Sequence, residues 1–119
     1  MRGTATIALL AAFGFLVVAF NPGNASEPEQ VIKISAKKFE FMPNQITLKK
    51  GVPVVLELTS EDRVHGFNAP DLRARTAILP GKTTTLRVVP EKVGSFDFFC
   101  DIFCGSGHEG MNGKINVTE

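Results

Sequence analysis

The chain has 119 residues, enough for one domain, and a formal net charge of +1. Its 13 Lys and Arg residues are balanced by 12 Asp and Glu residues, and no run of like charge occurs. Nucleic acid is therefore not expected as a partner, because its phosphates require a cationic face.

The first 25 residues have the order of a secretory signal peptide. Arg2 is followed by an uncharged, largely apolar stretch, and small residues at Gly23 and Ala25 precede the predicted cleavage point. The alternative is an N-terminal membrane anchor that stays uncut, although residues 4–20 only just reach the about 17–25 residues that a membrane-spanning helix needs. Both interpretations predict a periplasmic or otherwise extracytoplasmic domain, bound to a membrane only if residues 1–25 are retained.

Residues 26–30 are polar and are predicted to form a flexible lead-in to a single domain of residues 31–119. In this domain short β-rich segments alternate with turn residues, which predicts an all-β sandwich or barrel of about seven or eight strands. Residues 54–59 alternate apolar and other side chains, as in a strand with one buried face. Pro53 predicts that the start of this strand lies at a sheet edge. Met42 and the phenylalanines are expected in the core.

The remaining strands are expected at residues 31–34, 39–41, 46–48, 76–79, 83–89, 95–99 and 115–117. No segment has a helical period over three turns. His65 is expected in a loop that follows the strand of residues 54–59.

Residues 100–111, between the last two predicted strands, contain the side chains that indicate a function. Cysteine, histidine and methionine are the ligand types that favour copper over calcium or magnesium. Glycines within this segment allow it to fold tightly, so that several side chains can meet at one point. Loops at one end of a sandwich cluster together, so His65 can reach the same point. Asp101 and Glu109 are expected to be solvated carboxylates.

The number of cysteines indicates the type of site. A mononuclear blue-copper centre uses one cysteine, whereas this segment has Cys100 and Cys104. Two thiolates can bridge two copper ions, with one histidine for each ion and weak positions for Met111 and a main-chain carbonyl. Such a centre shares one unpaired electron between two metals and suits an electron carrier. A disulfide between the cysteines and a zinc site of two cysteines and two histidines stay open as alternatives, although zinc leaves Met111 without a role.

At these residues the chain resembles the copper-A (CuA) domain of cytochrome c oxidase subunit II, which is shared with the C-terminal domain of nitrous oxide reductase. The family motif Cys-x3-Cys-x3-His-x2-Met is matched from Cys100 to Met111, and Val64-His65-Gly66-Phe67 is similar to the segment that provides the first histidine. The resemblance extends over about residues 39–119 and implies a cupredoxin-like Greek-key β-sandwich.

The resemblance also implies a metal site with two copper ions. Its bridging ligands would be Cys100 and Cys104, its terminal ligands His65 and His108, and its weak ligands Met111 and the main-chain carbonyl of Ile102.

Two departures from the family bear on function. Oxidase subunits often carry glutamate at the position of Ile102, and many receive electrons near a tryptophan, which this chain lacks. We therefore predict an exported electron carrier whose partner is a redox protein such as a c-type cytochrome or a terminal reductase or oxidase. The alternatives are a subunit II-like component of a membrane cytochrome oxidase, and a carrier that delivers copper to an oxidase. No residue is placed for acid–base or nucleophilic catalysis, so the chain by itself is not predicted to be an enzyme.

Overall fold

The structure is a computed structural model that describes Gly3, Gly14 and residues 29–119. Apart from Gly3 and Gly14, the predicted signal peptide or anchor (1–25) lies outside the described residues, as does most of the lead-in (26–30). The described part of the chain contains these elements: β1 (Gln30–Lys37), β2 (Glu40–Met42), β3 (Gln45–Lys49), β4 (Val54–Ser60), β5 (His65–Ala69), the 3₁₀ helix η1 (Pro70–Leu72), β6 (Ala74–Ile78), β7 (Thr84–Val88), β8 (Gly94–Phe99), the 3₁₀ helix η2 (His108–Gly110) and β9 (Asn112–Thr118). None of the helices found there is long and apolar enough to cross a membrane.

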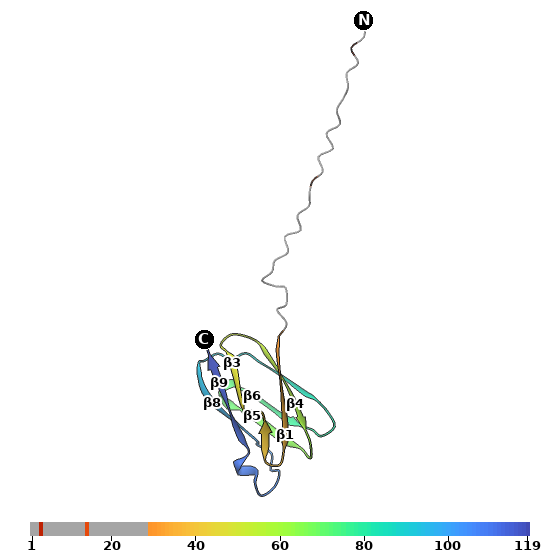
Figure 1. Ribbon diagram of the computed structural model, residues 1–119, viewed down its shortest axis with the longest axis vertical. Coiled ribbons are helices and arrows are strands. Elements are labelled where there is room, and N and C mark those ends of the chain that lie inside the picture. Colours follow the sequence, from red (N-terminus) through yellow and green to blue (C-terminus); the bar gives the residue numbers. More distant parts are fainter. Residues whose placement is uncertain (1–2, 4–13, 15–28) are drawn as a thin grey trace.

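The strands form two sheets that pack face to face (Figure 1). One sheet has the order β2-β1-β4-β7 and the other the order β3-β9-β8-β5-β6. Strands β1 and β4 are parallel, as are β3 and β9, and the other neighbouring pairs are antiparallel. The prediction of an all-β sandwich is confirmed.

Strand β4 follows the predicted period of two, but its position in the sheet does not follow the prediction from Pro53. Val54, Leu56 and Leu58 are fully buried, and the residues between them are partly exposed. The strand lies between β1 and β7, so it is not an edge strand. Pro53 precedes the first strand residue, where its missing N–H removes no ladder hydrogen bond.

Strand β5 was not predicted, and His65 is its first residue rather than part of a loop. The strand has no alternation to reveal it, because four of its five residues are buried. The ligand-bearing segment covers one of its faces: a Cβ on Gly66 would meet Asp101. A strand that is covered on both faces carries mainly small or apolar side chains on both of them. The alternation of apolar and polar residues that marks a half-buried strand is therefore lost.

The core lies between the sheets and is built from aliphatic side chains around three phenylalanines. The rings of Phe41, Phe67 and Phe98 come from β2, β5 and β8, with centroids 5.1–6.2 Å apart. The prediction of a core position is wrong for Met42, which is 60% exposed on the outward face of β2. It is also wrong for Phe103, which is 72% exposed, and for Phe99, which is 37% exposed at the end of β8.

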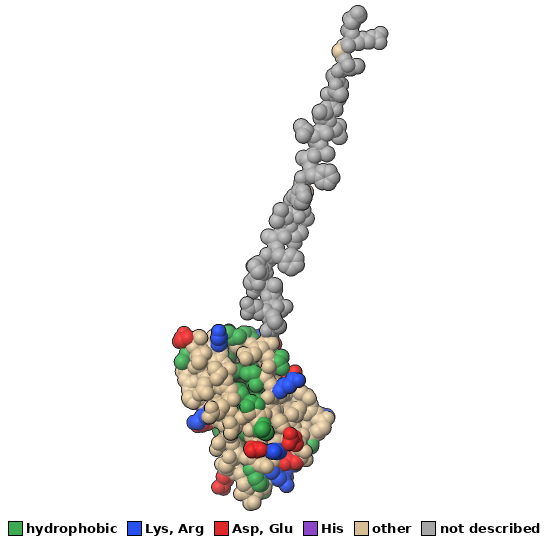
Figure 2. Space-filling view, viewed as in Figure 1, with side chains coloured by type: hydrophobic (Ala, Val, Ile, Leu, Met, Phe, Trp, Pro, Cys, Tyr) green, Lys and Arg blue, Asp and Glu red, His purple; other side chains and the backbone are tan. Residues whose placement is uncertain are grey.

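Acidic and basic side chains are interspersed on the face shown in Figure 2, with no broad area of one sign. Residues 100–111 lie at the end of the sandwich opposite the C-terminus (Figure 1). The connection between β4 and β5 reaches the same end, because Arg63 is hydrogen-bonded to Cys104. The turn between β1 and β2 lies beside this connection, because the Lys38 N–H is hydrogen-bonded to Asp62. This end therefore collects the side chains that the sequence indicated.

Candidate metal centre

Main-chain hydrogen bonds close residues 100–111 into a compact loop. Cys100 follows β8 and Met111 precedes β9, and the Cys100 N–H donates to the Met111 carbonyl at 3.0 Å. The His108 N–H donates to the Gly105 carbonyl at 3.1 Å, and the Met111 N–H donates to the His108 carbonyl at 3.1 Å. The β8–β9 ladder thus continues into the loop, and η2 turns His108 back toward the cysteines.

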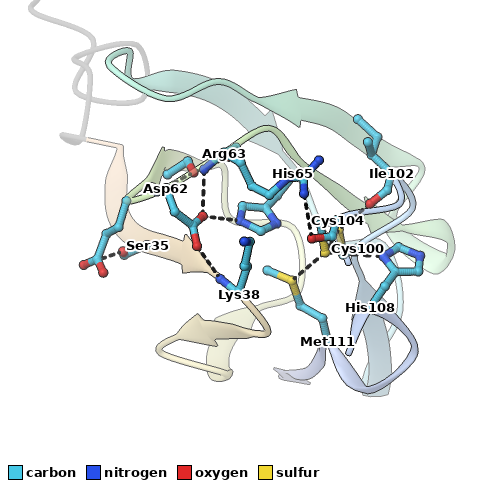
Figure 3. A network of polar contacts seen from close by, with 12 residues as sticks. Ser35, Lys38, Asp62, Arg63, His65, Cys100, Ile102, Cys104, His108 and Met111 are labelled. Atoms are coloured by element: carbon cyan, nitrogen blue, oxygen red, sulfur yellow. Dashed lines mark hydrogen bonds and ion pairs between the residues drawn. The ribbon is translucent and has the colours of Figure 1, made fainter. Parts of the chain in front are cut away.

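Sulfur atoms occupy the centre of this loop (Figure 3). The Sγ atoms of Cys100 and Cys104 are 3.8 Å apart, and Cys104 Sγ is 3.8 Å from Met111 Sδ and 3.5 Å from His108 Nδ1. Cys100 Sγ lies 3.2 Å from the Ile102 carbonyl oxygen. Both cysteines are buried and free. Their separation is far beyond the about 2.0 Å of a disulfide bond, so the site is formed with both thiols reduced.

His65 brings a ring nitrogen to the same cluster from β5. One nitrogen of its ring and the two cysteine sulfurs all lie within 4.8 Å of one another. The ring is fully buried; its Nε2 is 2.7 Å from Asp62 Oδ1, and its Nδ1 has no hydrogen-bond partner. A buried nitrogen without a partner is costly unless something binds it, and a neutral imidazole can bind a metal through it. The donor set is thus suited to a soft or borderline ion such as copper.

The structure brings together all six predicted site residues. Their role as metal ligands stays a prediction. The resemblance named the Ile102 carbonyl, and the contact of this oxygen with Cys100 shows that it faces the cluster.

Asp62, which lies outside the predicted ligand set, orients His65. Its carboxylate accepts hydrogen bonds from the His65 ring at 2.7 Å and from the main-chain N–H groups of Lys38 at 2.8 Å and Arg63 at 2.7 Å. Partial burial acts to raise the pKa of Asp62, but these hydrogen bonds outweigh it and bring the pKa down to about 2. The carboxylate therefore stays ionised and holds the proton of His65 on Nε2, which leaves Nδ1 free to bind.

The environment of Cys104 favours the neutral thiol when no metal is bound. Burial, and then the neighbouring Cys100 thiol, raise the pKa of Cys104 to about 11. The Gly66 N–H donates to Cys100 Sγ at 3.3 Å, a contact that also suits a thiolate. Because metals bind thiolates, metal uptake at this site must release protons.

Asp101 is not the solvated carboxylate that was predicted. Its side chain is only 17% exposed and accepts hydrogen bonds from Arg75 Nε at 2.5 Å, Arg75 Nη2 at 3.1 Å and Asn68 Nδ2 at 3.2 Å. Asn68 and Arg75 lie on β5 and β6, so this carboxylate ties the residue after Cys100 to the sheet. It passes so close to Gly66 that a Cβ there would lie 1.9 Å from Asp101 Oδ1.

Phe39 supports the loop from the turn between β1 and β2. A Cβ on Gly107 would lie 2.4 Å from its ring, and one on Gly105 would lie 2.9 Å from it. The ring is partly buried and packs against the core. No local pattern in the sequence points to Phe39 or Arg75 as support for the loop. For Asp62, the only signal is its position three residues before His65.

Comparisons with known proteins show the family to which this chain belongs. The Cupredoxin-like domain family matches residues 7–117. The chain belongs to this cupredoxin-like family. It is 32% identical over 91 residues to cytochrome c oxidase subunit 2 of Thermus thermophilus, which covers 76% of this chain and 67% of the relative. It is also 32% identical over 90 residues to the nitrous-oxide reductase of Cupriavidus necator, which covers 72% of this chain and 14% of that enzyme.

Among solved structures, the cupredoxin resembles the periplasmic domain of cytochrome oxidase subunit II of Bradyrhizobium japonicum, with a TM-score of 0.70. The identity is 20%, and the match covers 76% of this chain and 85% of that one. This likeness confirms the cupredoxin-like fold that the resemblance implied. Because the match to the nitrous-oxide reductase covers only a small part of that enzyme, it concerns one domain of it.

Proposed function

We propose that this cupredoxin is an extracytoplasmic electron-transfer protein that holds a binuclear copper centre of the CuA type. The observation that carries the proposal is a pair of buried, reduced cysteines with sulfurs 3.8 Å apart, beside a buried histidine nitrogen that has no partner. A single copper ion of the blue type needs only one of these thiols. The similarity to oxidase subunit 2 and nitrous-oxide reductase supports the same conclusion.

In the proposed centre, each side chain has a distinct task. Cys100 and Cys104 would supply the two thiolates that hold the copper ions, His65 and His108 would supply the two imidazoles, and Met111 and the Ile102 carbonyl would be the weak ligands. When bound, the copper pair would accept and release one electron. Asp62 holds His65 in one tautomer, and Asp101 and Phe39 hold the loop, so the ligands need little movement when the charge changes. Burial of both cysteines keeps water from the sulfurs.

The proposed partner is a redox protein such as a c-type cytochrome or a terminal reductase or oxidase. Phe103 and His108 support an exchange of electrons at the surface, because the exposed Phe103 ring lies 5.8 Å from the His108 ring. A partner that contacts Phe103 comes close to one of the proposed ligands.

The test is the copper content and the electron paramagnetic resonance spectrum of the purified protein after reduction and loading. We expect two copper ions per chain and a seven-line hyperfine pattern from one electron shared by two coppers. Cys104→Ser should lose the shared pattern and at least one copper. One equivalent of copper with a four-line spectrum would contradict the binuclear centre, as would full uptake by the serine variant. An exclusive preference for zinc would contradict copper altogether.

A second candidate is a subunit II-like component of a membrane cytochrome oxidase, favoured by the 32% identity to an oxidase subunit. Fractionation of the native host separates the two. A mature chain that starts at Ser26 in the soluble extracytoplasmic fraction supports the free carrier. A full-length chain that purifies with membranes and a haem-copper oxidase supports the subunit.

A further inference from the structure

We propose that Arg63 is a positioning residue that joins the two segments bearing the ligands and raises the reduction potential of the centre by placing a fixed positive charge beside Cys104. This inference rests on the proposed function. It concerns a residue that has no role in the ligand motif.

Hydrogen bonds hold both the N–H and the carbonyl of Arg63 in place. Its N–H donates to Asp62 Oδ1 at 2.7 Å, and its carbonyl accepts a hydrogen bond from the Ser60 hydroxyl. Asp62 is itself bonded to the Lys38 N–H and to the His65 ring. The backbone from which the Arg63 side chain extends is therefore held in position, two residues before His65.

From this position, the guanidinium reaches the loop of the cysteines. Arg63 Nη1 donates to the main-chain carbonyl of Cys104 at 3.1 Å, across 41 residues of sequence (Figure 3). Within the described part of the chain, this is the hydrogen bond that links residues 61–64 to residues 101–111. The His65 segment and the Cys104 segment are thus joined by a charged donor, which makes a stronger bond than a neutral one.

The effect of the Arg63 charge on the reduction potential has a sign that can be tested. Arginine is protonated at all ordinary pH values, and its charge lies next to the backbone of a proposed bridging ligand. Removing an electron from the centre adds positive charge, which a neighbouring cation disfavours. Asp62 offsets part of this effect, but its carboxylate is turned toward His65 and the N–H groups of Lys38 and Arg63. For an exposed cation close to the site, the reduced form should gain roughly three- to tenfold in population over a variant without the charge.

The test compares Arg63→Met, Arg63→Lys and Arg87→Met. Arg87 is a matched control, because it is also an exposed arginine but pairs with Glu29 and lies on β7, in the sheet that carries none of the proposed ligands. The copper-loaded proteins are titrated by spectroelectrochemistry at one ionic strength, and copper release to a strong chelator is timed. In the reduced, metal-free proteins, the ¹⁵N shift of the Gly105 amide is measured, because this amide shares its peptide group with the Cys104 carbonyl.

We expect Arg63→Met to lower the reduction potential by the equivalent of roughly three- to tenfold in the redox equilibrium and to speed copper release by about tenfold. The seven-line spectrum should remain. Arg63→Lys should keep most of the potential, because it keeps the charge, but should still release copper faster than wild type. Arg87→Met should match wild type in every measurement. In the metal-free protein, only the two Arg63 variants should shift the Gly105 signal.

An unchanged potential in Arg63→Met would overturn the electrostatic role, and an unchanged Gly105 shift would overturn the link to Cys104. Equal changes in Arg63→Met and Arg87→Met would assign the effect to net charge alone. If wild type shows no seven-line spectrum, the proposed function fails by itself, and the Gly105 shift still decides whether Arg63 positions the loop.

Discussion

Replacing Gly66 with alanine tests how closely the ligand loop lies against β5. The added Cβ would lie 1.9 Å from Asp101 Oδ1 and 3.0 Å from the main-chain nitrogens of Asp101 and Ile102. The carboxylate cannot swing aside freely, because Arg75 and Asn68 hold it. The two main-chain nitrogens can move only if the whole loop moves.

The expected cost combines two terms. Forcing a methyl group into a closely packed place costs about 1–3 kcal/mol. Displacing Asp101 from the half-exposed Arg75 adds up to about 1 kcal/mol. We therefore expect Gly66→Ala to lower the free energy of unfolding by about 2–4 kcal/mol, measured by urea denaturation of the reduced, metal-free protein. The variant should also take up less copper, because the displaced loop carries Cys100 and Cys104.

Two further variants make this test specific. A Cβ on Gly110 meets nothing within 4 Å, so Gly110→Ala should stay within about 0.5 kcal/mol of wild type. Adding Asp101→Ala to Gly66→Ala removes the closest clash, so the double variant should be about 1–2 kcal/mol more stable than the sum of the single effects. The reasoning is refuted if Gly66→Ala is as stable as Gly110→Ala, or if the two effects simply add.

Three other variants probe the support of the site and the core. Asp62→Asn should weaken copper binding by about 10- to 100-fold in competition with a chelator, because the ionised acceptor that orients His65 is lost; wild-type affinity would argue against this role. Phe39→Ala should speed hydrogen exchange of the amides of residues 105–108, because the ring that packs against Gly107 is gone; unchanged exchange would show that the loop holds itself. Leu56→Ala, at a fully buried position of β4, should cost about 2–5 kcal/mol in urea unfolding, and a cost below about 1 kcal/mol would contradict the packing of the core.

The strands that the sequence predicted are those whose alternation is local. Residues 54–59 have one face against the core and one that is partly exposed, so the period of two is visible in the sequence. Strand β5 has no such contrast, because the core covers one side of it and the ligand loop covers the other. Met42 and Phe103 are apolar but exposed. They show that an apolar side chain does not by itself indicate whether a neighbour will cover it.

The candidate site could be predicted to a similar degree. Cys100, Cys104, His108 and Met111 lie within twelve residues of chain, so their spacing alone indicated one site. His65 was joined to them by the clustering of loops and by resemblance. The carboxylate of Asp101 was expected in solvent. Its partner Arg75 lies 26 residues away, and no pattern in the nearby sequence indicates that the two side chains meet.

The sequence by itself determined which donor atoms are available and that a short, glycine-rich loop between two strands carries most of them. Only the tertiary structure decided which nitrogen of His65 stays free, which carbonyl Arg63 reaches, and why position 66 has no room for a side chain. The physical reason is the separation along the chain. Spacing within a loop is set by covalent geometry, whereas the hydrogen bonds of Gly66 and Arg63 to the loop join residues 34 and 41 positions apart and exist only once both sheets have packed.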